Sequence, residues 1–437
     1  MSRYLWRGWV TTQLTAPEFH VTYPGLWWVR PLPAPWMHLV LVVTAIAGFG
    51  LALGWRQRWS AALALLGFGW VESVDAATYL NHYELVTLML ALCVALPMSD
   101  AWSLDRRAGR RGPRTGEPGA GGTVAVGVVW AMRAQLGVVY VFAALAKVQA
   151  DWLVHGQPLT TWLAARTDVP LVGGLFINPS VGLALSWAGA TFDLLVVPAL
   201  LWKRTRAAAY VAVVVFHVVT GLLFPRIGVF PWLMIALTPI FFDPNWPARA
   251  LGRFHRSRRA PTGSEPHANR GTDARPVRYR VVAVALVIVA VEIALPLRHL
   301  VIPGDVRWSE EGYRWSWRVL VTERSGVATF HVTDPGTGRS AISLPSDHLT
   351  PQQVTYVSSR PEAIRQYAHF VAGRYAEMWH LPPGSVPVVT VDAWVSVNGS
   401  ARSRIVDPTV DLARASPALG RPSWVLPARW ERENPGT

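Results

Sequence analysis

The 437-residue chain is poor in cysteine and in charge. Its one cysteine, Cys93, leaves no internal disulfide and no cysteine metal site. Only 16% of the residues are charged and 51% are hydrophobic, with a mean hydropathy of +0.25. This composition excludes an ordinary soluble domain and indicates a membrane protein. The first 20 residues are too polar for a signal peptide.

Several active-site fingerprints are missing as well. The chain has no GxSxG motif, no P-loop, no dinucleotide-binding glycine motif and no HxxxH pair on a predicted helix. We therefore expect no metal. The formal net charge of +14 would suggest nucleic acid in a soluble protein. Here the arginines cluster in short loops between apolar segments, so we expect no nucleic-acid partner.

Lysine is scarce too, because only Lys147 and Lys203 stand among the 41 basic residues. Lys147 follows a long apolar run in VFAALAKVQADWLVHG, residues 141–156. Arginine stays charged under ordinary conditions, whereas a lysine can lose its proton when it is partly desolvated. Position 147 therefore suits an amine that can become neutral. The alternative is a lysine at a helix end that reaches toward the lipid headgroups.

Eight apolar runs approach the roughly 20 residues that a bilayer crossing needs. They lie at 37–54, 60–75, 83–98, 124–146, 181–202, 207–224, 228–242 and 281–297. The alternate loops 55–59, 99–123, 203–206 and 243–280 hold nearly half of the basic residues, which places those loops in the cytoplasm. Residues 99–123 and 248–279 are predicted to be flexible loops. Residues 1–297 are thus predicted to form a polytopic α-helical membrane bundle of about eight spans.

From residue 298 the pattern becomes mostly β. The segments 315–322, 327–333 and 386–398 are rich in β-branched and aromatic residues, and DPGTG at 334–338 is a turn signal. Residues 361–379 have helical spacing of apolar side chains. We predict a β-rich extracytoplasmic domain over 298–437, on the same side as residues 1–36, 76–82, 147–180 and 225–227.

Three titratable residues fall at the same depth of the predicted bundle. His82 begins the third run at its outer end, Lys147 ends the fourth, and His217 lies in the sixth. Ionisable groups at membrane depth are functional candidates, so these residues and a carboxylate nearby could form one proton-handling site. The alternatives are a core histidine at 217 bonded to a carbonyl, an interfacial histidine at 82 and a structural ion pair for Asp193.

At these positions the chain resembles the vitamin K-dependent gamma-carboxylase family, as a bacterial homologue with the horizontally transferred transmembrane domain. Six segments resemble family tracts in the same order: 19–40, YLNHYEL (79–85), YVFAALAKVQADWLVHGQPL (140–159), 214–232, GYRWSWRVLV (312–321) and 391–413. The family normally has one more helix before the first run, so we expect a preceding helix to be missing. Thr322 and Thr409 stand where animal members carry a histidine and an arginine.

The resemblance implies a lyase in the plasma membrane of a bacterium, in contact with membrane lipid. Lys147 would deprotonate reduced vitamin K or menaquinol, and oxygen would convert the quinol to an epoxide. The strong base formed on the way would remove a γ-proton from a glutamate-containing peptide or protein, and the carbanion would take up carbon dioxide. His82 and His217 would support the quinol chemistry. Asn81 and Asp151 would support the quinol site, and Trp152 would either stack near it or only mark the membrane interface.

The outer domain would bind the peptide substrate, with Trp315, Ser316 and Trp317 near the glutamyl group. A strand-core position for these tryptophans is the alternative. Thr322 and Thr409 replace residues that the resemblance links to recognition of the glutamyl substrate. An alternative function is therefore quinol epoxidation or oxygenation without carboxylation. A non-enzymatic membrane scaffold with a partner-binding outer domain is the second alternative.

Overall fold

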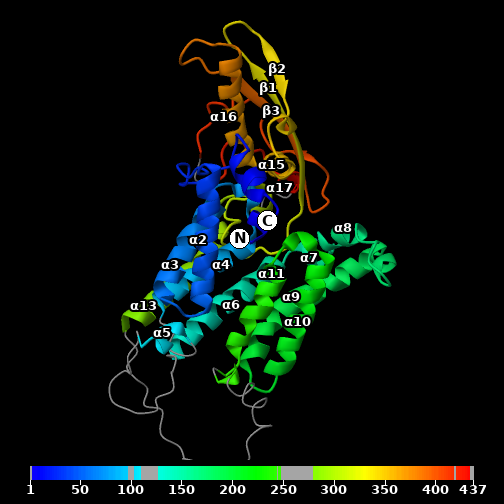
Figure 1. Cartoon of the computed structure of the whole chain (residues 1–437). Coiled ribbons are helices and arrows are strands. Elements are labelled where there is room, and N and C mark those ends of the chain that lie inside the picture. Colours follow the sequence, from blue (N-terminus) through cyan, green and yellow to red (C-terminus); the bar gives the residue numbers. More distant parts are fainter. Residues whose placement is uncertain are drawn as a thin grey trace, which may run out of the picture.

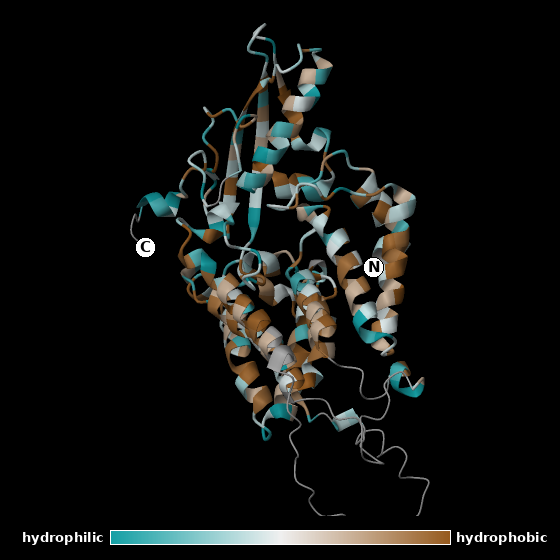
Figure 2. Cartoon of the chain, turned by 90° about the vertical axis from the view of Figure 1, so that its left-hand side faces the viewer, coloured by the Kyte–Doolittle hydropathy of each residue, from teal (hydrophilic) through white to brown (hydrophobic). Residues whose placement is uncertain are grey.

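A helical bundle carries a small β domain at one end in the computed structural model (Figure 1). The structure describes residues 2–96, 103–109, 126–243, 245–247, 279–417 and 420–433. Figure 2 shows the bundle helices as mostly hydrophobic, whereas the β domain mixes hydrophobic and hydrophilic residues. This contrast agrees with a membrane-embedded part and a part outside the bilayer.

Each of the eight predicted apolar runs falls on a helix. The bundle consists of α2 (Ala34–Ala52), α3 (Gln57–Ser73), α4 (Asn81–Ala95), α6 (Val126–Ala146), α9 (Pro179–Leu201), α10 (Arg206–Leu223), α11 (Phe230–Leu237), continued by η5 (Thr238–Phe241), and α13 (Tyr279–Leu297). Proline stands in the first turn of α2, α9 and α11, where its missing N–H costs no hydrogen bond.

Four helices of the described residues are long and apolar enough to cross a membrane. They are Ala34–Ala52, Gly127–Ala146, Pro179–Leu201 and Arg206–Leu223, and the apolar helices Asn81–Ala95 and Phe230–Phe241 are shorter. A membrane protein is therefore confirmed at this level, whereas the count of eight spans stays a prediction.

The end of the bundle opposite the β domain holds the described part of the predicted cytoplasmic loops (Figure 1). The short helix α5 (Leu104–Arg107) lies against the α2–α3 turn, because the backbone N–H of Leu104 bonds the carbonyl of Leu53. The flexible loops predicted at 99–123 and 248–279 otherwise lie almost entirely outside the described residues.

Short helices fill the outer connection between α6 and α9. These are α7 (Ala150–Leu153), α8 (Leu159–Ala164) and η3 (Gly173–Ile177). A Cβ on Gly182 of α9 would collide with Thr160 of α8, so the close contact of these helices requires glycine there. The segment is thereby held beside the first turns of α9.

The β domain is built on a four-stranded antiparallel sheet in the order β2-β1-β3-β4. Its strands are β1 (Arg324–Thr333), β2 (Ser340–Ser343), β3 (Val388–Val397) and β4 (Ser403–Arg404). Side chains of β1 and β3 alternate between buried and less buried, and α16 (Pro361–Met378) contacts both strands. The predicted strands at 327–333 and 386–398, the turn at 334–338 and the helix at 361–379 are confirmed.

The N-terminal segment contributes to the core of this domain. Phe19 and Val21 are buried in the same hydrophobic cluster as Phe330, Tyr367 and Val391. The remaining short elements are α1 (Ser2–Trp6), η1 (Val10–Thr15), η2 (Ala76–Thr78), η4 (Pro225–Ile227), η7 (Arg298–Leu300), α14 (Val306–Ser309), η8 (Pro345–Asp347), α15 (Pro351–Val357) and α17 (Arg429–Glu433).

The strand predicted at 315–322 is wrong. These residues form irregular turns, and β1 begins only at Arg324. Trp315, Trp317 and Leu320 have left-handed φ angles of 55°, 54° and 58°, which no β-strand contains. Trp317 is instead buried in the hydrophobic core of the helical bundle, so tertiary packing overrides the β propensity of the segment.

Candidate functional site

A cavity of about 390 Å³ lies within the bundle, between α6, α9, α10 and α11. Its size falls in the range of small-molecule sites, and most of its wall is apolar. The ionisable side chains that reach it are Lys147, Asp193, His217 and Tyr140. A few polar groups converging in an apolar cavity are typical of a ligand-binding site.

Lys147 is buried at the end of α6, with a 5% exposed fraction. Its Nζ donates hydrogen bonds to Asp193 Oδ2 at 2.7 Å and to the carbonyl of Ala143 at 3.2 Å. The same Nζ lies 5.2 Å from the centre of the Trp152 ring. The amine is therefore held inside the bundle by α9, and the alternative of a lysine that reaches the headgroups does not hold.

His217 is buried on α10 and joins the same cavity. Its Nε2 lies 3.0 Å from the hydroxyl of Tyr140, and the two share a hydrogen bond. Its Nδ1 is buried with no hydrogen-bond partner among the described residues. His217 is therefore not bonded to a backbone carbonyl, as the alternative supposed. Its Nδ1 is left for a ligand.

His82 does not line the cavity. It is buried near the start of α4, where its ring lies 4.6 Å from the ring of Tyr83 and 6.0 Å from that of Phe230, between centroids. Phe230 also contacts His217, at 5.9 Å between centroids, and lines the cavity. The structure therefore brings Lys147 and His217 to one cavity and places His82 behind Phe230.

Of the three residues predicted to support the quinol site, Asn81, Asp151 and Trp152, only Trp152 lines the cavity. Its indole N–H donates to the carbonyl of Ser186 on α9 at 2.7 Å, and its side chain lines the cavity beside Lys147. Asp151, one residue earlier, turns to the β domain instead. Its Oδ2 accepts hydrogen bonds from Arg307 Nη1 at 2.7 Å and from Asn398 Nδ2 at 2.9 Å.

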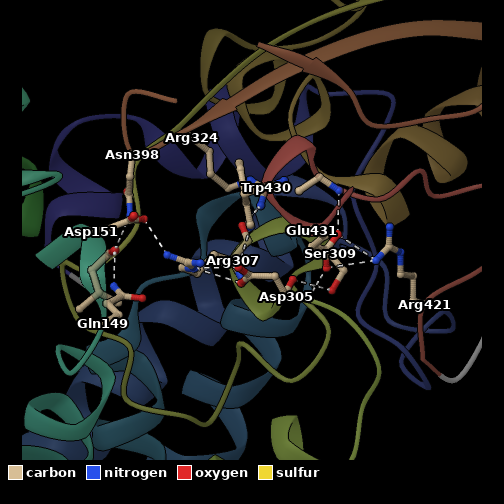
Figure 3. A network of polar contacts seen from close by, with 12 residues as sticks. Gln149, Asp151, Asp305, Arg307, Ser309, Arg324, Asn398, Arg421, Trp430 and Glu431 are labelled. Carbon is tan, nitrogen blue, oxygen red and sulfur yellow. Dashed lines mark hydrogen bonds and ion pairs between the residues drawn. The ribbon is translucent and has the colours of Figure 1, made fainter. Parts of the chain in front are cut away.

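Arg307 ties this junction to the C-terminal end of the chain. It lies between Asp151 and Asp305, and the indole N–H of Trp430 also donates to Asp305 Oδ2 (Figure 3). Burial alone would raise the pKa of Asp305, but the hydrogen bonds and charge of Arg307 hold it below its usual value. α7, which carries Trp152, is thus joined to the β domain by the Asp151–Arg307 ion pair and by the hydrogen bond from Asn398.

Asn81 belongs to a second junction and does not line the cavity. Its amide donates to the carbonyl of Arg318 at 3.3 Å, and its oxygen accepts from Tyr79. Glu84, also on α4, accepts the backbone N–H of Trp315 at 2.8 Å. These contacts hold the 312–322 segment onto the bundle.

The segment 315–320, which precedes the first strand of the β domain, packs into the helical bundle. Ser316 and Trp317 are buried, and Trp317 packs in the bundle core. Val319 and Leu320 line the cavity that holds Lys147. Trp315, Ser316 and Trp317 stay predicted substrate neighbours, whereas Val319 and Leu320 form part of the cavity wall.

Sequence reasoning missed Tyr140, Glu84 and the two wall residues Val319 and Leu320. Tyr140 could have been found, because it precedes Lys147 by seven residues on one helix and so shares its face. Nothing in the pattern of 312–322 indicated a segment that enters the bundle.

Two family models match the chain. The HTTM domain matches residues 1–246, and the vitamin K-dependent gamma-carboxylase lumenal domain matches residues 277–431. No solved structure matches it. Within the described ranges, no group of three or more His, Cys, Asp or Glu side chains is placed to hold a metal ion.

Proposed function

The chain belongs to the vitamin K-dependent gamma-carboxylase family, and from this membership we propose that it is a quinol-dependent glutamyl carboxylase. The family implies a membrane protein that uses reduced vitamin K and acts on glutamate-containing substrates. Its lumenal domain lies on the non-cytosolic side. We further propose that oxygen and carbon dioxide are co-substrates, that menaquinol is the quinol and that the enzyme lies in a bacterial plasma membrane.

The cavity fits a reduced naphthoquinone. Its wall is mostly apolar, which suits the ring system, and His217 Nδ1 is a buried polar atom without a protein partner. Lys147, His217 and Trp152 would hold the ring. When bound, the quinol supplies the electrons that reduce oxygen and, through that oxidation, the base that takes the γ-proton.

The observation that carries the proposal is the buried Lys147–Asp193 pair at the cavity wall. A general base must be unprotonated and within hydrogen-bond reach of the proton it takes. Desolvation penalises both charges of a buried ion pair. A proton shift across the 2.7 Å contact from Nζ to Asp193 Oδ2 would leave Lys147 as a neutral amine facing the cavity.

His217 and the aromatic wall serve the later steps in this proposal. The imidazole, oriented by Tyr140, can donate or accept a proton through Nδ1 and can stabilise developing negative charge. Phe192, Phe216 and Phe230 surround His217 and keep water out of the cavity. Excluding water protects a glutamyl carbanion from protonation before carbon dioxide reacts with it.

The β domain would present the glutamyl side chain to the cavity. Val319 and Leu320 form part of the wall, and Trp315 to Trp317 precede them with only Arg318 in between. The edge strand β2 could pair with an extended peptide by strand addition. This role of the β domain is tested by measuring carboxylation of a glutamyl peptide.

The experiment compares two lysine variants in lipid nanodiscs. Quinone epoxide and incorporation of labelled carbon dioxide into a glutamyl peptide are measured separately. Lys147→Ala should lose both products by about 10²-fold or more, because the general base is gone. Lys203→Ala, in the exposed turn that follows α9, should keep both.

The other outcomes decide between the alternatives. Epoxide without label in the wild type would favour an epoxidase that does not carboxylate, which the threonines at 322 and 409 make the second candidate. Unchanged quinol oxidation in Lys147→Ala would contradict the proposed role of the lysine and favour the scaffold.

A further inference from the structure

The cavity has an open side between α9 and α10. Leu185 and Ala188 on α9, and Val215 and Val219 on α10, line the cavity and are also exposed on the outside of the bundle. Val215 keeps an exposed fraction of 57% and Val219 one of 46%. A side chain that lines a cavity and is also exposed marks the place where that cavity opens.

This opening faces the bilayer. α9 and α10 are two of the helices long and apolar enough to span a membrane, and only 33% and 22% of their apolar stretches are buried, against 67% for α6. Their exposed residues near the opening are apolar, including Leu194, Val211 and Leu222. A molecule passing between these helices would come from hydrocarbon, without crossing water.

Two aromatic rings contact each other across the gap between α9 and α10, which is called the α9–α10 seam below. Phe192 of α9 and Phe216 of α10 stack with centroids 4.0 Å apart and planes at 17°. Both rings line the cavity. Phe192 directly precedes Asp193, and Phe216 directly precedes His217. The stack therefore lies beside the polar groups of the site.

We propose that the α9–α10 seam is a lateral portal for the lipophilic tail of the quinol, and that the Phe192–Phe216 stack clamps it. The identity of the ligand rests on the proposed function. The ring occupies the cavity beside Lys147 and His217, while the tail leaves between Leu185, Ala188, Val215 and Val219 into the lipid. An apolar tail on this path keeps an apolar environment throughout.

The first test maps the tail by photolabelling. A naphthoquinone with a prenyl tail ending in a diazirine is irradiated with the full chain in nanodiscs, and labelled peptides are identified by mass spectrometry. The label should concentrate in residues 179–223. Val219→Trp should remove most of it, because the indole fills the portal. Leu222→Trp is the matched control, since Leu222 is 66% exposed on the same helix and does not line the cavity.

The second test compares substrates with and without a tail. Val219→Trp should raise KM for a long-tailed quinol by at least about tenfold more than it raises KM for a tail-less quinol. Phe216→Leu, which removes the stack, should raise KM for the long-tailed quinol more than KM for the tail-less quinol.

The outcomes separate the two proposals. Turnover with equal labelling of Val219→Trp and Leu222→Trp overturns the portal and leaves the carboxylase function standing. Labelling confined to the seam in a wild type that turns over neither quinol supports the portal and overturns the function.

Discussion

The Lys147–Asp193 pair is the residue-scale feature on which the site depends. Both side chains are nearly fully buried, at 6% and 7% exposure. A buried pair gains little net stability over an apolar replacement, but removal of one partner leaves the other charge without compensation. The contribution of the pair to stability can therefore be separated from its contribution to activity by comparing a single with a double substitution.

Lys147→Ala should lower the free energy of unfolding by about 3–5 kcal/mol, because it leaves the Asp193 carboxylate buried and unpaired. The double variant Lys147→Met/Asp193→Leu should stay near the wild type in stability and have no activity. Denaturant unfolding in micelles measures both. Equal losses of stability in the single and double variants would contradict the buried-pair account.

At this scale the sequence indicated much of the site. Lys147, His217 and Asp193 were visible as ionisable residues in apolar runs, and the structure brings all three to one cavity. His82 was equally visible but lies behind Phe230. Depth along a helix can be predicted from topology, whereas the direction a side chain faces depends on packing between helices.

The segment 310–322 is the element that composition could not predict. Four of its non-glycine residues have left-handed backbone angles: Glu310, Trp315, Trp317 and Leu320. Such conformations persist only where surrounding contacts hold them. Here Glu310 pairs with Arg360 at 2.7 Å, and Glu84 binds Trp315. Helices and strands, by contrast, were predictable because their periodicity repeats over many residues.

Glu311 in this segment should make stability depend on pH. Burial, then the charges of Glu362 and Glu310, raise its pKa from 4.5 to about 7. The folded state thus binds the proton more tightly than the unfolded state. Its contribution to stability is fully present below about pH 4.5 and is lost as pH rises through about 7.

Glu311→Gln keeps the shape of the protonated side chain. The variant should therefore show a flatter dependence of the unfolding midpoint over this pH window, and a higher midpoint than the wild type at alkaline pH. Glu377→Gln, on the exposed face of α16, is the control and should follow the wild type. A wild-type curve retained in Glu311→Gln would sink this prediction.

For the whole molecule, the β domain is not built from one end of the chain. Phe19, from the N-terminal segment, packs against Tyr367 and Phe370 of α16, with ring centroids 5.5 and 5.2 Å apart. Gln353 of α15 donates to the carbonyl of Phe19 and to Asp75. The N-terminal segment and the β domain therefore share a core.

Phe19→Ala should cost about 3–5 kcal/mol, because it opens a hole in that shared core. Hydrogen exchange should show faster exchange in β1, β3 and α16, more than a hundred residues away along the sequence. Trp6→Ala, at an 89% exposed position, should change little. Exchange that rises only near residue 19 would count against a shared core.

Val319 and Leu320 have a consequence for engineering. The two family models meet between residues 246 and 277, which invites a chimaera joined there. Yet both residues lie downstream of that joint and line the cavity that holds Lys147. A chimaera that takes its β domain from another family member would therefore replace part of the cavity wall. Such hybrids should differ in the reaction they catalyse as well as in the peptides they accept.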